Sequence, residues 1–339
     1  MIYVGVDGGA SRTRVLALES GSGRVGRAEG AGSSPEVWGP ERALALLKDL
    51  LGRAIAAAGG GPEAPVSAAF ALAGVDTEAE RIRVSALLAE ALPGWSIRLI
   101  NDTWAALWGG APEGGPAVAV VAGTGANAAA RDASGRLFTL RGKGYEQGNY
   151  GGGIDLARAA LHAAFRSEEG SGAGTRLEPE LLALTGARDY DELAERLGGG
   201  QAAPSDEVFR LVAAIPPLVV RLAGEGDAVA QELLLEMGRK LAGSARAAAR
   251  QAGLSAPVGG PALPVVLAGG LFRPENPWLE DALRLELHRS LPAADCRRAA
   301  REPVRGALLL SLEGGPALER AERERLRRLA LEGEAVVSG

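Results

Sequence analysis

Two glycine-rich turns, at residues 8–9 and 123–125, each follow an apolar run long enough for a β-strand. The first run reads IYVGVDGG and returns through Thr13, and the second reads AVAVVAGTGAN. Glycine lets another backbone or a ligand approach closely. A hairpin whose tip carries glycine and hydroxyl residues presents a row of N–H donors, which suits phosphate oxygens. Two such hairpins, facing each other with carboxylates between them, predict a site for a metal-bound polyphosphate beside a base.

Acidic residues end two strands close to these turns. Asp7 ends the first strand, and the pair Asn101-Asp102 ends the strand SIRLI. Open α/β sheets bind ligands at the carboxyl ends of their strands. We interpret Asp7 as an outer ligand of a nucleotide-bound Mg²⁺ and Asp102 as a general base for a hydroxyl that attacks a γ-phosphate. Two simpler interpretations stay open: an Asp-Gly turn at Asp7, and a helix N-cap at Asp102.

The order of elements divides the chain into two halves. In residues 1–114 we expect strands at 2–7, 13–19, 66–73 and 96–100, another after 21–23, and helices at 41–58, 78–92 and from 103. In residues 115–316 we expect strands at 117–122, 126–131, 137–141 and 264–267, and helices at 278–287 and 304–312. A helical insertion spans about 153–254, and a charged helix occupies 317–332. Alternating strands and helices predict an α/β protein with a mixed sheet flanked by helices in each half.

The composition excludes several classes of protein. A chain of 339 residues is long enough for two domains, and its net charge of −5 argues against nucleic acid as a partner. No apolar run approaches the length of a membrane span. Cys296 is the only cysteine, which excludes internal disulfides and cysteine-rich metal sites. The chain begins directly with a strand pattern, so we expect a cytoplasmic protein without a membrane partner.

Two glycine motifs allow a second interpretation. The stretch from Gly123 to Ala128 also fits the dinucleotide fingerprint G-x-G-x-x-A, which requires a helix to open at the loop. Here a short apolar run and the turn 132–135 follow, which favours a hairpin. Gly269-Gly270 follow the strand PVVLA and would let an adenine or ribose lie against the backbone. An ordinary strand-to-helix turn explains that pair equally well.

Five segments together resemble the actin/hexokinase/heat-shock-70 ATPase superfamily. They are VGVDGGASRTRVLAL, FALAGVD, NDTWAALWGG, VVAGTGANAAARDASGRL and VVLAGGLF. Within it the chain most resembles the family of N-acetylglucosamine kinases and BadF/BadG/BcrA/BcrD-type ATPases. The resemblance implies two ribonuclease-H-like domains that close on ATP, Mg²⁺ and a sugar. It also implies a homodimer and a last helix, about 317–339, that returns to the first domain.

The resemblance assigns roles to individual residues. It places the catalytic base at Asp102 and the metal-facing carboxylate at Asp7. The residues implied for the nucleotide are Gly8, Gly9, Ser11, Arg12, Thr13, Gly123, Thr124, Gly125, Gly269 and Gly270. Those implied for the sugar are Ser34, Asn101, Asp102, Ala126, Asn127, Lys143 and Asn149.

The sugar-facing motifs depart from the family pattern. Ser33-Ser34 replace a Ser/Thr-Asn pair, and Ala126 replaces the serine of GTGSN. Lys143 stands where the family has a tryptophan, and Asn149-Tyr150 stand where it has Asp-Glu. An amide accepts hydrogen bonds from sugar hydroxyls less strongly than a carboxylate does. By sequence, therefore, the phosphate machinery is complete and the acceptor pocket is altered.

These observations favour an ATP-dependent sugar kinase resembling N-acetylglucosamine kinases. One alternative is a nucleotide- or sugar-binding sensor on a kinase-like scaffold, which the altered pocket motivates. Another is an activator of 2-hydroxyacyl-CoA dehydratases, which shares the fold but needs two cluster-binding cysteines from each subunit. The single cysteine argues against that role.

Overall fold

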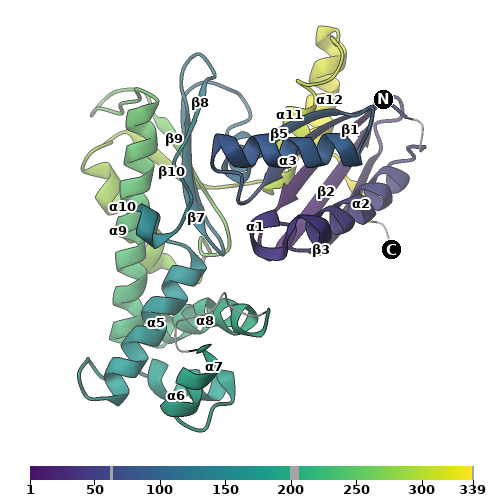
Figure 1. Ribbon diagram of the computed structural model, residues 1–339. Coiled ribbons are helices and arrows are strands. Elements are labelled where there is room, and N and C mark those ends of the chain that lie inside the picture. Colours follow the sequence, from purple (N-terminus) through teal and green to yellow (C-terminus); the bar gives the residue numbers. More distant parts are fainter. Residues whose placement is uncertain (62–63, 199–205, 338–339) are drawn as a thin grey trace.

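The computed structural model describes residues 1–61, 64–198 and 206–337 and contains two β-sheets that lie side by side (Figure 1). The first sheet has the strand order β11-β3-β2-β1-β4-β5. Its strands are β1 (Ile2–Gly8), β2 (Arg12–Glu19), β3 (Val25–Ala31), β4 (Val66–Leu72), β5 (Ser96–Asn101) and β11 (Ala335–Val337). Strands β1, β2 and β3 form an antiparallel meander, and β4 and β5 continue the sheet in parallel with β1.

The second sheet repeats this plan. Its strand order is β10-β9-β6-β7-β8. Its strands are β6 (Ala117–Ala122), β7 (Ala126–Arg131), β8 (Leu137–Thr139), β9 (Leu263–Ala268) and β10 (Ala294–Arg298). A meander of β6, β7 and β8 is followed by the parallel strands β9 and β10. The predicted α/β class, with a mixed sheet in each half, is confirmed.

Helices cover both faces of the first sheet. They are α1 (Pro35–Trp38), α2 (Pro40–Ala57), α3 (Glu78–Ala91), α4 (Asp102–Gly110), α11 (Pro303–Ser311) and α12 (Arg320–Glu332). Apolar side chains of α2 and α3 form one core with the sheet, and those of α11 and α12 form another on the opposite face. We call this sheet and these helices the first lobe.

The second sheet carries the predicted helical insertion. Its helices are α5 (Gly153–Glu168), α6 (Leu177–Thr185), α7 (Tyr190–Arg196), α8 (Asp206–Gly224), α9 (Ala228–Gln251) and α10 (Pro277–His288), and a 3₁₀ turn covers Tyr145–Gln147. Helices α9 and α10 lie along the sheet, and α5 to α8 extend beyond it (Figure 1). We call this sheet and α5 to α10 the second lobe.

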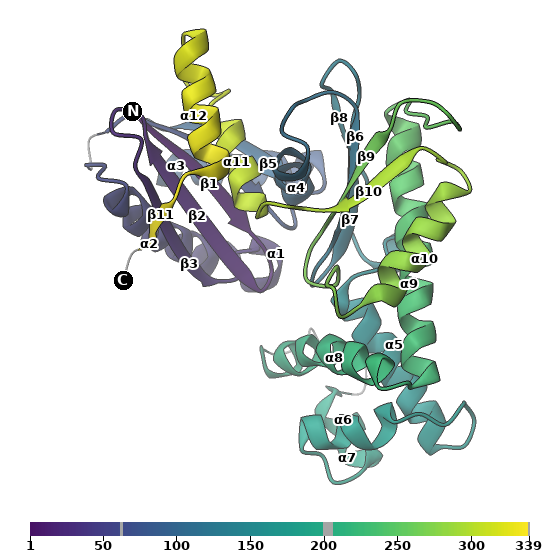
Figure 2. The ribbon, with the colours of Figure 1, turned by 180° about the vertical axis from the view of Figure 1, so that it is seen from behind.

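One helix lies in a different half from the one we expected. Residues 304–312 were assigned to the second half, but α11 packs against β1, β4 and α4 of the first lobe. After β10 the chain crosses directly from the second sheet to the first (Figure 2). The apolar pattern of this helix predicts that it is buried. The pattern does not predict which of the two similar sheets the helix packs against. Apart from this correction, the division at residues 114 and 316 stays a prediction.

Gly306 lets α11 cross α4 at backbone contact. A Cβ atom at this position would lie 2.0 Å from Ala105 O and 2.6 Å from Gly109 N. Gly306→Ala should therefore lower the free energy of unfolding by about 2 kcal/mol, as overpacking in a core does. Gly52→Ala is the control, because its Cβ would meet nothing within 4 Å and should stabilise α2 by up to about 1 kcal/mol. Urea denaturation of both variants measures the difference, and equal stabilities would contradict the close crossing.

Two strands have no counterpart in our sequence-based assignment. Strand β10 contains Cys296 and reads ADCRR, which lacks an apolar alternation. Strand β11 is short and pairs in parallel with β3 at the sheet edge. It lies just after α12, so the C-terminal segment returns to the first lobe as the family resemblance implies. Within the described ranges, no helix is long and apolar enough to cross a membrane.

Candidate active site

The hairpin between β1 and β2 forms the first phosphate-loop candidate, which we call the first tip (residues 8–13). Gly9 N donates to Arg12 O at 2.9 Å, so the turn is tight. A Cβ on Gly8 would lie 2.5 Å from the Leu72 side chain, which explains a glycine there. Ser11 and Arg12 are exposed, whereas Thr13 is fully buried and donates to Ser33 Oγ at 2.8 Å. Ser11 therefore faces the cavity, Arg12 lies on the surface, and Thr13 packs inside the lobe.

The turn between β6 and β7 forms the second tip (residues 123–126). Gly123 N donates to Gly125 O at 2.9 Å, and β7 pairs with β6 immediately afterwards. The hairpin that we favoured over a dinucleotide fold is confirmed. Helix α5 begins against this tip, because Gly153 N donates to Gly123 O at 2.8 Å. A Cβ on Gly152 would lie 2.5 Å from the Gly125 carbonyl carbon, so a glycine is required where helix and tip meet.

The two tips meet across the cleft between the lobes. Ser11 Oγ and Thr124 Oγ1 lie 2.8 Å apart. Both residues line a cavity of about 840 Å³, together with Gly123, Gly270 and the paired prolines of α8. Most of its remaining lining belongs to α8 and to the segment after β9. A largely apolar cavity with two glycine turns at its mouth has the size and chemistry expected of a nucleotide site.

Gly269 and Gly270 serve this cavity in different ways. Gly269 has φ +103°, and a Cβ there would lie 2.3 Å from Ala122 O. Leu271 N donates to the same oxygen at 3.0 Å, which fastens the turn to the end of β6. Gly270 lines the cavity itself. Gly269 thus shapes the turn, and Gly270 offers open backbone to a ligand.

An aromatic contact steadies the first tip. Trp38, at the end of α1, donates from Nε1 to Ala10 O at 2.6 Å. Its ring meets Phe209 of α8 edge-on, with ring centroids 5.6 Å apart. The wall of the cavity formed by α8 is therefore joined to the opposite lobe. Sequence patterns did not predict this contact, because neither aromatic residue belongs to a recognisable motif.

Asp7 lies close enough to Asp102 to influence the ionisation of the Asp102 carboxyl group. Burial, followed by the charges of Asp7 and Asp76, raises the pKa of Asp102 to about 7. Burial also raises the pKa of Asp7 to about 6, against the opposing effect of Arg14. Asp102 is thus poised near neutral pH, as a general base requires. The two carboxylates that we selected from sequence thus lie near each other, at the ends of β1 and β5, and their roles stay predictions.

The helix N-cap that we considered for Asp102 belongs instead to Asn101. Asn101 Oδ1 accepts from Thr103 N at 3.0 Å, and Asp102 is the first residue of α4. Asn101 Nδ2 donates to Val75 O at 3.2 Å and to Asp76 Oδ1 at 2.8 Å. The Asn101 side chain is thus satisfied within the first lobe. The cap of α4 is therefore made by Asn101, while backbone N–H groups of Asp102 and Thr103 hydrogen-bond to the Asp102 carboxylate and partly oppose the rise of its pKa.

The other residues predicted for the sugar divide between the two lobes. Asn127, on β7, donates to Asp76 Oδ1 at 3.0 Å, and Asn149 donates to Ala126 O at 2.6 Å. Ser34 is buried and donates to Ala73 O at 3.3 Å. These three side chains therefore hold backbone or a neighbouring side chain, and their contact with a sugar stays a prediction.

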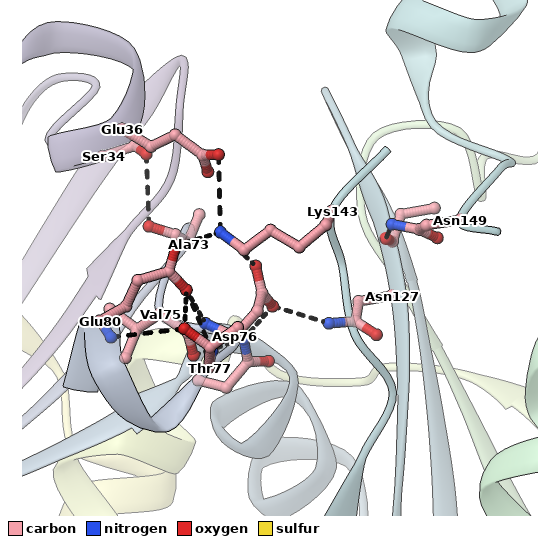
Figure 3. A network of polar contacts seen from close by, with 12 residues as sticks. Ser34, Glu36, Ala73, Val75, Asp76, Thr77, Glu80, Asn127, Lys143 and Asn149 are labelled. Atoms are coloured by element: carbon pink, nitrogen blue, oxygen red, sulfur yellow. Dashed lines mark hydrogen bonds and ion pairs between the residues drawn. The ribbon is translucent and has the colours of Figure 1, made fainter. Parts of the chain in front are cut away.

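Lys143 reaches from the second lobe into a cluster of acids on the first (Figure 3). Its ammonium pairs with Glu80, lies 3.5 Å from Glu36 Oε1 and lies 4.0 Å from Asp76 Oδ2. Burial alone would lower the pKa of Lys143, but the Glu80 contact and the other two carboxylates outweigh it and raise the pKa. Lys143 is therefore a permanent cation that joins the lobes.

Sequence reasoning missed Asp76, although it lies within the quoted segment FALAGVD. The signal was available, since Asp76 follows the carboxyl end of a buried parallel strand, as Asp102 does. Burial, together with Glu80 and Glu36, raises the pKa of Asp76, and Lys143 opposes this effect.

Asp7 is the residue best suited to a nucleotide-bound cation. Within the described residues, no group of three or more His, Cys, Asp or Glu side chains is arranged to hold a metal. Mg²⁺ bound to a nucleotide, however, needs only one or two protein carboxylates. The Asp7 side chain is 15% exposed, and Arg14 Nη1 approaches only its Oδ2, at 3.5 Å. A partly buried carboxylate with one weak cationic partner fits such an ion.

Comparison with known proteins agrees with this geometry. The model of the BadF/BadG/BcrA/BcrD ATPase family matches residues 4–311. An N-acetyl-D-glucosamine kinase from Dictyostelium discoideum is 24% identical over 323 residues, covering 92% of this chain and 98% of that protein. A crystal structure of a candidate N-acetylglucosamine kinase from Chromobacterium violaceum is 26% identical, with TM-score 0.69 and coverage of 91% and 98%.

A more distant structure matches the fold alone. It is a ROK family glucokinase from Streptomyces griseus in complex with glucose and AMPPNP, 18% identical, with TM-score 0.58 and coverage of 91% of this chain and 97% of that one. Because the family model spans both lobes and every segment that carries the two tips, the chain belongs to the BadF/BadG/BcrA/BcrD ATPase family.

Proposed function

We propose that the protein transfers the γ-phosphate of ATP to a hydroxyl group of a sugar or amino sugar, as an N-acetylglucosamine kinase-like enzyme. One observation carries this proposal: Ser11 and Thr124 of the two tips meet at 2.8 Å and line the 840 Å³ cavity, and the first tip directly follows Asp7, whose charge raises the pKa of Asp102. Relatives named for N-acetylglucosamine phosphorylation cover nearly the whole chain and support it.

In this proposal, each part of the site has a separate role in phosphate transfer. The adenosine lies in the cavity beside Gly270, and the tips with Ser11 and Thr124 bind the β- and γ-phosphates. Asp102 accepts the proton of the acceptor hydroxyl as its oxygen attacks the γ-phosphorus and the bond to ADP breaks. Mg²⁺, held through Asp7, would neutralise phosphate charge. Contact between the lobes excludes water, which limits hydrolysis of ATP.

The test is a panel of hexoses, amino sugars and N-acetylated sugars incubated with ATP and Mg²⁺. We expect ADP formation to depend on the sugar and to match the amount of sugar phosphate detected by mass spectrometry. Equal ADP formation with and without every sugar would contradict the proposal.

A binding sensor is the second candidate, and the acceptor side motivates it. Asn101, Asn127 and Lys143 already have partners within the protein. A sensor would bind nucleotide or sugar without sugar-dependent turnover, so the same panel separates the two functions.

A homodimer and a cytoplasmic location remain part of the proposal. Light scattering of the purified protein tests whether it forms a dimer.

The pH dependence of kcat/KM for the sugar should report the ionisation of Asp102. The general base must be deprotonated, and the pKa of Asp102 is about 7 because of burial and the charges of Asp7 and Asp76. Activity should therefore fall as the pH drops through 7, approaching about tenfold per pH unit on the acidic side. Initial rates between pH 5 and 9 measure this. A constant kcat/KM down to pH 5 would contradict the assigned base.

A further inference from the structure

The carboxylate of Asp76 contacts polar side chains from both lobes. Its Oδ1 accepts from Asn101 Nδ2 at 2.8 Å and from Asn127 Nδ2 at 3.0 Å. Its Oδ2 lies 4.0 Å from Lys143 Nζ, and its side chain is only 7% exposed. Figure 3 shows Asn127 and Lys143 pointing toward it from the second lobe. Asp76 is thus a junction between the lobes on the acceptor side of the cleft.

Each partner controls a different part of the site. Asn101 caps α4 and directly precedes the proposed base Asp102. Asn127 lies on β7, next to the second tip. Lys143 belongs to the segment after β8 and is also held by Glu80 of α3. Through one carboxylate, the element that carries the base is linked to the element that carries a phosphate turn.

The chemistry of the junction calls for a carboxylate. A buried charge is costly unless it is paired and hydrogen-bonded, and Asp76 obtains two amide donors and an ammonium. Gly142 packs directly on this junction, because a Cβ there would lie 2.8 Å from both Asp76 Oδ1 and Asn127 Nδ2. The site therefore leaves no space for a side chain at position 142 that would separate the partners.

We propose that Asp76 is a positioning residue of the acceptor site: by holding Asn101 and Asn127 on one oxygen, it fixes the base of one lobe relative to the phosphate turn of the other. The inference rests on the proposed phosphotransfer and adds to it a residue that none of the sequence motifs identified. Asp76 acts through its partners, so its loss affects the transfer step more than the binding of ATP. The cavity that would hold the nucleotide does not include it.

The test compares Asp76→Ala and Asp76→Asn in the full-length protein, with ATP and the best acceptor of the panel. We expect Asp76→Ala to lower kcat by about 30-fold or more, since small misplacements of reacting groups are costly, while KM for ATP changes less than threefold. Asp76→Asn keeps one carbonyl oxygen that can accept from both amides. Its kcat should therefore be at least threefold higher than that of Asp76→Ala. Glu78→Gln, an exposed acid two residues further on, is the control and should match the wild type.

A double-mutant cycle tests the link between the lobes. If Asp76 and Asn127 act through one contact, the kcat of the double variant (Asp76→Ala and Asn127→Ala) should be no more than about threefold below that of the worse single variant. The same cycle with Asp76→Leu, which also removes the carboxylate but keeps a similar volume, replaces it if the alanine variant does not fold, as judged by circular dichroism.

Three results would overturn the inference. They are a wild-type kcat in Asp76→Ala, multiplicative losses in the cycle, or an asparagine variant as impaired as the alanine variant. A wild-type protein that phosphorylates no acceptor would instead overturn the proposed function, and the inference with it.

Discussion

Replacing Asp102 by asparagine should lower kcat for sugar phosphorylation by about 10³-fold, within the range that a general base contributes. Asparagine has nearly the same size and can occupy the first position of α4, but it cannot accept a proton at neutral pH. KM for ATP should change less than threefold, because the cavity is lined by other residues. Steady-state rates with varied ATP and varied acceptor measure both parameters.

The control for this variant is Asp49→Asn. Asp49 is exposed on α2 and pairs with Arg53, four residues on, so its replacement should leave kcat unchanged. Thermal unfolding establishes that both variants are folded. A folded Asp102→Asn protein with a kcat within tenfold of the wild type would assign the base to another group. An equal loss in both variants would indicate damage unrelated to the carboxylate.

The elements that present the site were predictable because their signals are local. Each tip follows a strand of apolar residues and carries glycines, and at Gly8 of the first tip a Cβ would clash with Leu72. The acids at 7 and 102 come at strand ends, and the carboxyl ends of parallel strands lie on one edge of a sheet. Strand pattern and turn chemistry therefore sufficed to predict that the two carboxylates lie near each other.

The packing partners of the later helices were not predictable in the same way. The apolar face of α11 would suit either of two sheets built to one plan, and the chain returns to the first. The close crossing at Gly306 depends on Ala105, about 200 residues earlier in the chain, and no local pattern reveals it. Strands β10 and β11 were not predicted. Most residues of β10 are polar, and β11 is short and lies at the edge of its sheet.

Within the site, sequence patterns identified residues but not their partners. Asn101 was predicted to touch a sugar, and its amide is occupied by Asp76 and by the cap of α4. Lys143 was recognised as a substitution, and the three acids that surround it come from a distant part of the chain. Which groups remain free for a ligand is a property of tertiary contacts, and local spacing carries no information about it.

Replacing Asp7 by asparagine should lower kcat by about 100-fold and raise the Mg²⁺ concentration for half-maximal rate severalfold, because an amide binds a hard cation more weakly than a carboxylate does. The fold should persist, since Arg14 keeps Glu302 as a partner at 3.1 Å. Rates at fixed ATP and varied Mg²⁺ provide the measurement.

A second measurement separates this role from a purely structural one. The charge of Asp7 raises the pKa of Asp102, so Asp7→Asn should move the acidic limb of kcat/KM to lower pH. Glu29→Gln is the matched control, because it removes another acid near Arg14, at 3.9 Å on β3, and should alter neither the Mg²⁺ dependence nor the pH profile, since the charges that raise the pKa of Asp102 are those of Asp7 and Asp76. If Asp7→Asn reduced the rate equally at every Mg²⁺ concentration and every pH, Asp7 would serve only to hold Arg14. If instead both profiles shift together, the carboxylates at 7 and 102 face one reaction centre.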